Sequence, residues 1–288
     1  MAALRLLSRS STLLDLQGLG LSSRALSTFE DLLKLPFGMI LLGGPTGSGK
    51  TTTLYAAIKR LDKLERNIMT IEDPVEYDFE GINQFQVNIK AGMTFAAGLR
   101  AFMRMDPDVI LVGEVRDNET AKIAAQAALT GHLVFTSIHA NDAVGVIHRM
   151  LDLEVEPFIL CSTAAGAISQ RVVRRICPDC KEVYQPSVEE QAAYEMNMGE
   201  AAVKLYRGAG CNTCSGTGYL GRVGVYEVMT VTEAVKRLIL AGVPVADIRN
   251  QALEEGMVPL MKDGMAKVKE GITTVSEILK HVYSVSPY

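Results

Sequence analysis

The segment at residues 44–51, GPTGSGKT, constrains what this 288-residue chain can fold into more than any other part of it. It satisfies the pattern G-x-x-x-x-G-K-[ST], whose glycines let successive backbone N–H groups turn inward and cradle phosphate oxygens. An apolar run at 37–43 precedes it, and a stretch with helical periodicity follows at 51–64. A chance match in a chain of this length is roughly a 1% event. The segment therefore predicts a phosphate-binding loop between a buried strand and a helix.

The chemistry expected at this loop is that of ATP with Mg²⁺. Lys50 would supply a point charge to the β- and γ-phosphates, and the Thr51 hydroxyl would ligate Mg²⁺. The helix that begins here directs the positive end of its dipole toward the anion. The predicted nucleotide-binding residues are Gly44, Pro45, Thr46, Gly47, Ser48, Gly49, Lys50, Thr51 and Thr52.

Strands and helices alternate along the first half of the chain. This alternation predicts an α/β fold with a mainly parallel sheet to about residue 152. The pattern also predicts that helix continues through 157–175 and returns over 231–283, with glycine-rich sequence between them. The expected strands are 37–43, 67–72, 82–89, 106–114 and 132–139, and the expected helices are 51–64, 93–105, 119–131 and 141–153.

Four side chains near the predicted strand ends are candidates for catalysis. Glu114 ends an apolar strand, and Glu76 closes an acidic segment after another strand. His132 and His139 bracket a third strand, and their odd separation of seven residues places them on opposite faces. Ligands in parallel sheets bind at the carboxyl ends of strands, which favours a shared site. Glu114 would then hold Mg²⁺ or polarise water; taken singly, each residue could instead be a surface acid or a hydrogen-bonded histidine.

The cysteines form a second candidate site. Four of the five lie in two Cys-x-x-Cys pairs, Cys177 with Cys180 and Cys211 with Cys214, separated by 30 residues. Two such pairs can present four thiolates tetrahedrally to a structural Zn²⁺, with the spacer looped out. The alternatives are a redox dithiol or small buried residues. Cys161 lies in an apolar stretch and is predicted to be a core residue. This cysteine usage favours a reducing compartment.

Four segments in order resemble the secretion ATPases of type II secretion and type IV pilus assembly. They are GPTGSGKTTTLYAAI, TIEDPVEY, DPDVILVGEVRD and LTGHLVFTSIHAND, and the likeness runs from about residue 4 to 283. The resemblance implies a RecA-like core and a hexameric, cytoplasmic ATPase that drives pilin or pseudopilin assembly. It also implies an inner-membrane platform protein as the partner. The tetracysteine pattern resembles the assembly ATPases rather than the pilus-retraction ATPases.

The resemblance also assigns residues. Glu76 closes the family's Asp box, Glu114 closes its Walker B element, and either could be the catalytic base. The histidines of the His box match His132 and His139. A charge-sensing role or a solvated helix face remains open for Arg100 and Arg104.

The resemblance predicts how the chain is divided. The expected parts are a remnant of a missing N-terminal domain at 1–30, an ATPase core at 31–170, a zinc subdomain at 171–221 and a mostly helical region at 222–288. A transit peptide in the arginine-containing first residues is disfavoured. Family members carry arginines in the missing domain, so hydrolysis by this chain alone is expected to be slow, since an arginine finger is worth about 10³–10⁵ in rate.

The net charge bears on which functions other than a secretion ATPase the chain could have. With 29 Lys and Arg against 33 Asp and Glu, the net charge is −4, which argues against a protein whose task is to neutralise phosphate backbones. The cluster Arg171, Arg174 and Arg175 is therefore assigned to a helix end or a subunit contact rather than to nucleic acid. Two alternatives stay open: a RecA-like motor that handles DNA, and a truncated scaffold that binds nucleotide and zinc without activity of its own.

Overall fold

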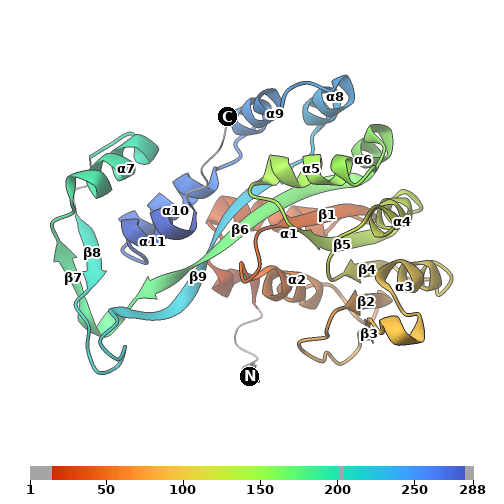
Figure 1. The fold of residues 1–288 in the computed structure, drawn as a ribbon, viewed down its shortest axis with the longest axis horizontal. Helices are drawn as coiled ribbons and strands as arrows, with labels where there is room; N and C mark the ends of the chain where they lie inside the picture. Colours follow the sequence, from red (N-terminus) through yellow and green to blue (C-terminus); the bar gives the residue numbers. More distant parts are fainter. Residues whose placement is uncertain (1–14, 202–203, 283–288) are drawn as a thin grey trace.

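The computed structural model describes residues 15–201 and 204–282, and its centre is a seven-stranded sheet (Figure 1). The strand order is β3-β2-β4-β5-β1-β6-β9, parallel throughout except for β9, which pairs antiparallel with β6. The strands are β1 (Gly38–Gly43), β2 (Ile68–Glu72), β3 (Asn83–Gln86), β4 (Val109–Val112), β5 (Leu133–Ile138), β6 (Ala164–Ile176) and β9 (Tyr219–Thr230).

Helices cover both faces of this sheet because its central strands are apolar on both sides. In β1, Met39 and Leu41 join one core cluster, while Ile40 and Leu42 join the other. The first cluster is closed by α3 (Phe95–Phe102), α4 (Asn118–Leu129), α5 (Ala143–Asp152), α6 (Pro157–Thr163), α8 (Glu233–Ala241) and α9 (Val245–Glu254). The second is closed by the 3₁₀ helix η2 (Leu16–Leu19), α1 (Ser23–Leu33) and α2 (Lys50–Lys59). A further 3₁₀ helix, η3 (Ile89–Ala91), lies after β3.

A third cluster lies beyond the sheet, where β6 and β9 extend away from the other strands. It packs α7 (Val188–Met198), α10 (Leu260–Lys269) and α11 (Val275–His281) against these strand ends. Beside it stands a separate antiparallel pair, β7 (Lys181–Tyr184) and β8 (Leu205–Gly208), preceded by η4 (Pro178–Cys180). Figure 1 shows the two long strands running from the sheet toward this outlying pair.

The largest difference from the sequence-based expectation is at 164–176. The segment was expected to continue a helix through 157–175, but α6 ends at Thr163 and β6 begins at once. The sequence AAGAISQRVVRRI lacks the alternation of a half-exposed strand, because most of β6 is buried on both faces between β1 and β9. Strand preference at such a position is set by neighbouring strands rather than by local propensity.

The other elements of the first half lie where the alternation placed them, each shorter than expected by a few residues. The expected domain boundaries at 170/171 and 221/222 fall inside β6 and β9. Within residues 15–201 and 204–282, none of the helices combines the length and apolar character needed to cross a bilayer.

Candidate functional site

The phosphate loop joins the carboxyl end of β1 to the first turn of α2. Gly47 and Gly49 take positive φ angles of 79° and 86°, which glycine adopts without strain. The Lys50 ammonium donates to the carbonyl oxygens of Gly44 at 2.8 Å and Pro45 at 3.1 Å, so the loop is closed around its own lysine. Burial lowers the pKa of Lys50. No side chain caps the start of α2, which leaves its first N–H groups directed at the loop.

A carboxylate with two basic neighbours follows β4. Glu114 is 16% exposed, and its Oε2 accepts from Arg116, with Nη2 at 2.6 Å. Its Oε1 lies 2.7 Å from Nε2 of His139, which follows β5. The hydrogen bond and charge of Glu114 raise the pKa of Arg116, and the same carboxylate opposes the burial effect on Lys50. The structure therefore brings the predicted residues Glu114 and His139 together beside the phosphate loop.

The acidic segment after β2 divides into a buried and a more accessible carboxyl group. Glu72 is 2% exposed and accepts from the Tyr55 hydroxyl, from Thr70 Oγ1 at 2.6 Å and from Gln84 Nε2 at 3.1 Å. Burial raises the pKa of Tyr55. The backbone N–H of Glu76 donates to the same tyrosine hydroxyl at 3.2 Å, which ties this segment to α2. Glu72 is thus a structural anchor, while Glu76 is half-buried.

The structure does not bring His132 to the phosphate loop. It precedes β5, at the opposite end of that strand from His139, and its Nδ1 lies 2.7 Å from the carbonyl oxygen of Ala127. The odd spacing predicted that the two histidines lie on opposite faces of the sheet. In the structure they lie at the two ends of β5, separated by the whole strand. The candidate sensor Arg100 pairs with Glu119 across α3 and α4, as on a solvated helix surface.

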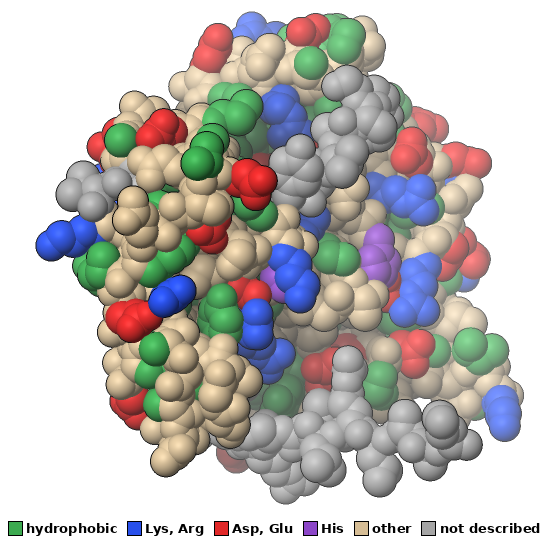
Figure 2. Space-filling model, turned by 60° about the vertical axis from the view of Figure 1, so that its left-hand side comes forward, with side chains coloured by type: hydrophobic (Ala, Val, Ile, Leu, Met, Phe, Trp, Pro, Cys, Tyr) green, Lys and Arg blue, Asp and Glu red, His purple; other side chains and the backbone are tan. Residues whose placement is uncertain are grey.

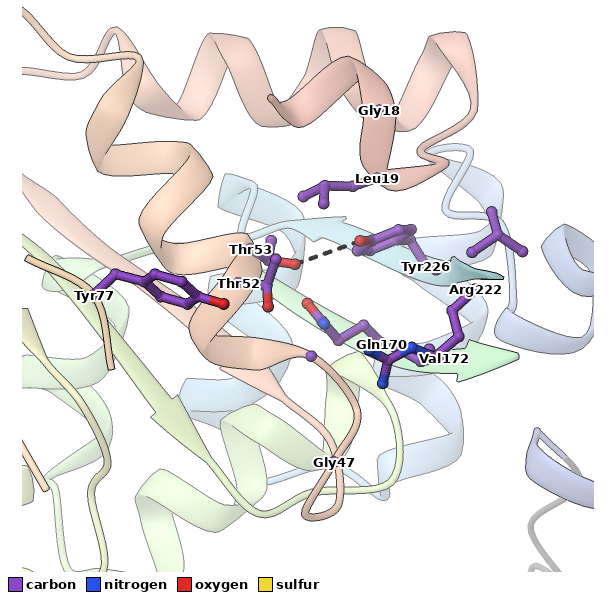
Figure 3. A pocket seen from close by; sticks show the side chains of 13 residues that line it. Gly18, Leu19, Gly47, Thr52, Thr53, Tyr77, Gln170, Val172, Arg222 and Tyr226 are labelled. Carbon is purple, nitrogen blue, oxygen red and sulfur yellow. Dashed lines mark hydrogen bonds between the residues drawn. The ribbon is translucent and has the colours of Figure 1, made fainter. Parts of the chain in front are cut away.

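A cavity of about 180 Å³ adjoins the phosphate loop between η2, α2 and β9 (Figure 3). Two of the residues that line it, Tyr226 and Thr53, have their hydroxyl oxygens 3.4 Å apart. Its wall combines loop glycines with the polar ends of a few side chains, as in pockets that hold one small molecule. The lining residues are Gly18, Leu19, Gly47, Gly49, Thr52, Thr53, Tyr77, Gln170, Val172, Arg222, Val223, Gly224 and Tyr226. Sequence reasoning missed the contributions of β6 and β9, because those strands were not foreseen.

The arginines expected at a helix end lie on β6 instead. Arg171 is 7% exposed, burial lowers its pKa, and its guanidinium donates to the carbonyl oxygens of Gln170 and Asn141, both at 3.0 Å. Arg174 pairs with Glu277 of α11 at 2.6 Å and stacks over the Tyr219 ring. Arg171 thus belongs to the floor of the site, and Arg174 to the attachment of α11.

The four paired cysteines converge. Their sulfur atoms all lie within 4.8 Å of one another, with Sγ–Sγ distances of 3.8, 3.8 and 3.7 Å for three of the pairs. A tetrahedron of sulfurs about 2.3 Å from a Zn²⁺ ion has edges of about 3.8 Å, so the spacing fits zinc. The backbone N–H of Cys211 lowers the pKa of Cys214 to about 6, aided by that of Gly218, whereas burial raises the pKa of Cys177 and of Cys180.

The surroundings of these cysteines agree with a structural centre rather than a redox one. The 30-residue spacer contains β7, α7 and β8. The cysteine cluster therefore joins the two ends of this folded segment. Cys161 stands apart in α6, where it is buried and its Sγ lies 3.6 Å from the Lys236 carbonyl oxygen, as expected of a core residue.

Comparison with known proteins agrees with this geometry. The family described as "Type II/IV secretion system protein" matches residues 1–280. Over 281 residues the chain is 46% identical to the type II secretion system ATPase E of Vibrio cholerae, covering 96% of this chain and 55% of that protein. It is 44% identical to the type IV pilus assembly ATPase PilB of Thermus thermophilus, covering 96% of this chain and 31% of that protein. The chain thus spans just over half the length of the first relative and just under a third of the second.

Solved structures share the fold. The pilus retraction motor PilT with bound ADP superposes with a TM-score of 0.70 at 29% identity, covering 98% of this chain and 70% of that one. The ATPase DotB of Legionella pneumophila gives a TM-score of 0.66 at 23% identity, covering 91% of this chain and 63% of that one. With the sequence matches, these findings establish that the chain belongs to the type II/IV secretion system protein family.

Proposed function

We propose that this chain binds ATP with Mg²⁺ and hydrolyses it, as the motor portion of a type II secretion or type IV pilus assembly ATPase. The observation that carries the proposal is the placement of Lys50 and Thr51 at the carboxyl end of β1, beside the Glu114–His139 contact. Its relatives named as ATPases, at 44–46% identity, support the same activity.

Each residue of the site has a distinct role in this proposal. Lys50 exchanges its bonds to the loop carbonyls for phosphate oxygens, and the adjoining cavity receives the nucleoside. Thr51 and Glu114 hold Mg²⁺, which when bound would offset the charge of the phosphates. Glu114 is the favoured base because its carboxylate contacts His139 and its charge acts on Lys50, whereas Glu76 is tied to α2 through its backbone N–H.

We also propose that the cysteine cluster holds one structural Zn²⁺. All four positions of a tetrahedron are filled by thiolates, which leaves no open position for water or substrate. The ion would tie the β7–β8 pair to the ends of β6 and β9. A four-cysteine site also favours an assembly motor over a retraction motor.

The larger machine follows from the family. We propose a hexameric ring on the cytoplasmic side of the inner membrane, with a membrane platform protein as its partner. Turnover would move subunits as rigid bodies. The chain spans 55% and 31% of the two relatives. We propose that turnover by this chain alone is slow and that further parts of such an ATPase raise it.

Surface charge separates this proposal from a DNA-handling motor. On the face shown in Figure 2, Lys and Arg side chains group around a central hollow, with Asp and Glu side chains bordering them. Such a mixed surface suits an extended phosphate backbone poorly, because acidic side chains lie among the basic ones. A DNA motor would instead show turnover that DNA stimulates and salt suppresses steeply.

Steady-state ATP hydrolysis tests the proposal. It is measured at several protein concentrations, alone and with the remaining portion of a relative such as the Vibrio protein added. We expect slow turnover that rises with concentration and with the added portion, and that DNA does not change. Turnover that stays at background under every condition would leave a nucleotide- and zinc-binding scaffold as the function.

A further inference from the structure

One side chain of β6, that of Gln170, forms a hydrogen bond to the backbone of the phosphate loop. The Gln170 Nε2 donates to the backbone carbonyl oxygen of Ser48 at 2.6 Å, across 122 residues of sequence. Gln170 is 1% exposed, so this bond is shielded from water. Its Oε1 has no hydrogen-bond partner among the described residues. An unpartnered buried oxygen is costly, so the donor end is the part of this amide that the fold uses.

The loop is packed against β6 so closely that its glycines are required there. A Cβ on Gly49 would lie 3.2 Å from Gln170 Nε2, and a Cβ on Gly44 would lie 2.8 Å from the Gln170 carbonyl oxygen. That carbonyl also accepts from Arg171. Both ends of the loop therefore rest on one residue of β6, while its middle, at Gly47, has open space.

The neighbouring strand β9 also contacts α2 through a side chain. Gln170 is paired in register with Tyr226 of β9, whose hydroxyl lies 3.4 Å from that of Thr53 in α2. Figure 3 shows the Gln170 and Tyr226 side chains directed toward the start of α2 from the two adjacent strands. Of these two contacts, only the one from Gln170 reaches the loop itself.

We propose that Gln170 is a positioning residue that holds the phosphate loop in its nucleotide-binding conformation through the bond to Ser48. The inference rests on the proposed function and names a residue that acts through the loop rather than on the phosphates. Without the bond, the loop samples other conformations in the free protein. Nucleotide must then select the competent fraction, so the apparent Kd rises as that fraction falls.

The test replaces Gln170 by Met, which keeps the length and volume of the side chain and removes its donor. We expect the melting temperature to fall modestly, because removing the orphan Gln170 oxygen offsets only part of the cost of leaving the Ser48 carbonyl without this donor. The Kd for MgADP should rise about tenfold, as the loss of one buried hydrogen bond implies. Hydrogen exchange at the amides of 46–51 should quicken in the ligand-free protein, and saturating MgADP should abolish that difference.

Thr273→Val is the matched control. Thr273 is fully buried, and its hydroxyl donates to the Arg174 carbonyl oxygen of the same strand at 2.8 Å, away from the phosphate loop. We expect its MgADP affinity and loop exchange to equal those of the wild type. Gln170→Asn, whose amide is one methylene too short to reach Ser48, serves as a second variant and should behave as Gln170→Met does.

The two measurements separate this inference from the proposed function. If the wild type binds no MgADP, the proposed function fails, and loop exchange in the ligand-free protein still decides the role of Gln170. If the wild type binds MgADP but both Gln170 variants match it in affinity and in loop exchange, the positioning role is overturned. It is overturned equally if Thr273→Val weakens binding and quickens loop exchange as much as Gln170→Met.

Discussion

At the scale of single residues, the Glu114 carboxylate is the centre of the proposed chemistry. It is mostly buried, it accepts from Arg116, and it lies 2.7 Å from His139. Each of its two oxygens therefore has a nitrogen of a neighbouring side chain beside it. An ionised carboxylate beside the phosphate loop can hold a cation or take a proton from water, whereas an amide of the same shape can do neither.

Replacing Glu114 by Gln should separate binding from hydrolysis. We expect kcat to fall by about 10²–10⁴, the range for loss of a general base. The affinity for ADP should stay within a few-fold, because Lys50 and the loop are untouched. Glu76→Gln is the companion variant, with a smaller expected loss. A larger loss in Glu76→Gln than in Glu114→Gln would transfer the role of the base to Glu76.

At the scale of elements, the β7–β8 pair depends on the four cysteines at its base. We expect one zinc per chain by elemental analysis, lost in Cys180→Ser, with faster hydrogen exchange in β7 and β8. ADP binding should persist, since β6 runs on to Ile176 before the first cysteine, well past Ser169, the residue that pairs with Gly43 at the end of β1. Cys161→Ser is the control and should retain its zinc, because Cys161 lies in α6. Zinc near zero in metal-replete wild type would refute the assignment.

The docking of α11 onto β6 is predicted to depend on pH. Burial pushes the pKa of Glu277 up, but the hydrogen bonds and charge of Arg174 outweigh it, and the pKa is lowered. A lowered pKa stabilises the fold above the unfolded value of about 4.5 and loses that effect as pH falls below it. The Glu277 side chain is 2% exposed, so the effect is only partly screened by solvent.

The corresponding variant is Glu277→Gln. Its free energy of unfolding should fall by about 1–2 kcal/mol at pH 7, because a charge-assisted hydrogen bond is lost. The difference from wild type should shrink as the pH is lowered from 7 toward 3, because the wild-type carboxylate takes up protons as the pH falls through its lowered pKa. Denaturant titrations at both pH values measure it, with the exposed Glu270→Gln as the control. An equal difference at both pH values would contradict the role of the Arg174 pair.

The sequence could predict those elements whose signals are local. The phosphate loop, the strands β1 to β5 and the cysteine pairs are all recognisable from spacing or from short apolar runs. β6 was not predictable in this way, because small and basic residues become a strand only between β1 and β9. The same error placed Arg171 at a helix end and hid Gln170 and Tyr226, whose contacts depend on strand register. His132 precedes β5, at the strand end away from the carboxyl edge where ligands are expected, and its catalytic role stays a prediction.

At the scale of the whole molecule, β6 and β9 join the nucleotide site to the C-terminal helices. The Glu227 carboxylate of β9 accepts from the first N–H of α5 at 2.7 Å and from the first N–H of α10 at 3.2 Å. Beside it, Asp263 of α10 accepts from the Tyr226 N–H at 2.9 Å and pairs with Lys267. Motion of the strands at the nucleotide site would therefore carry α10 with it, as a motor requires.

Equilibrium binding of MgADP to the wild type and to Lys50→Ala tests the central claim most directly. Lys50 is the one side chain of the described phosphate loop that carries a positive charge, and its removal should leave the fold intact. We predict one MgADP per chain in the wild type, measured by calorimetry, and no measurable binding in Lys50→Ala at the same melting temperature. Unchanged affinity in Lys50→Ala would show that the loop is not the nucleotide site.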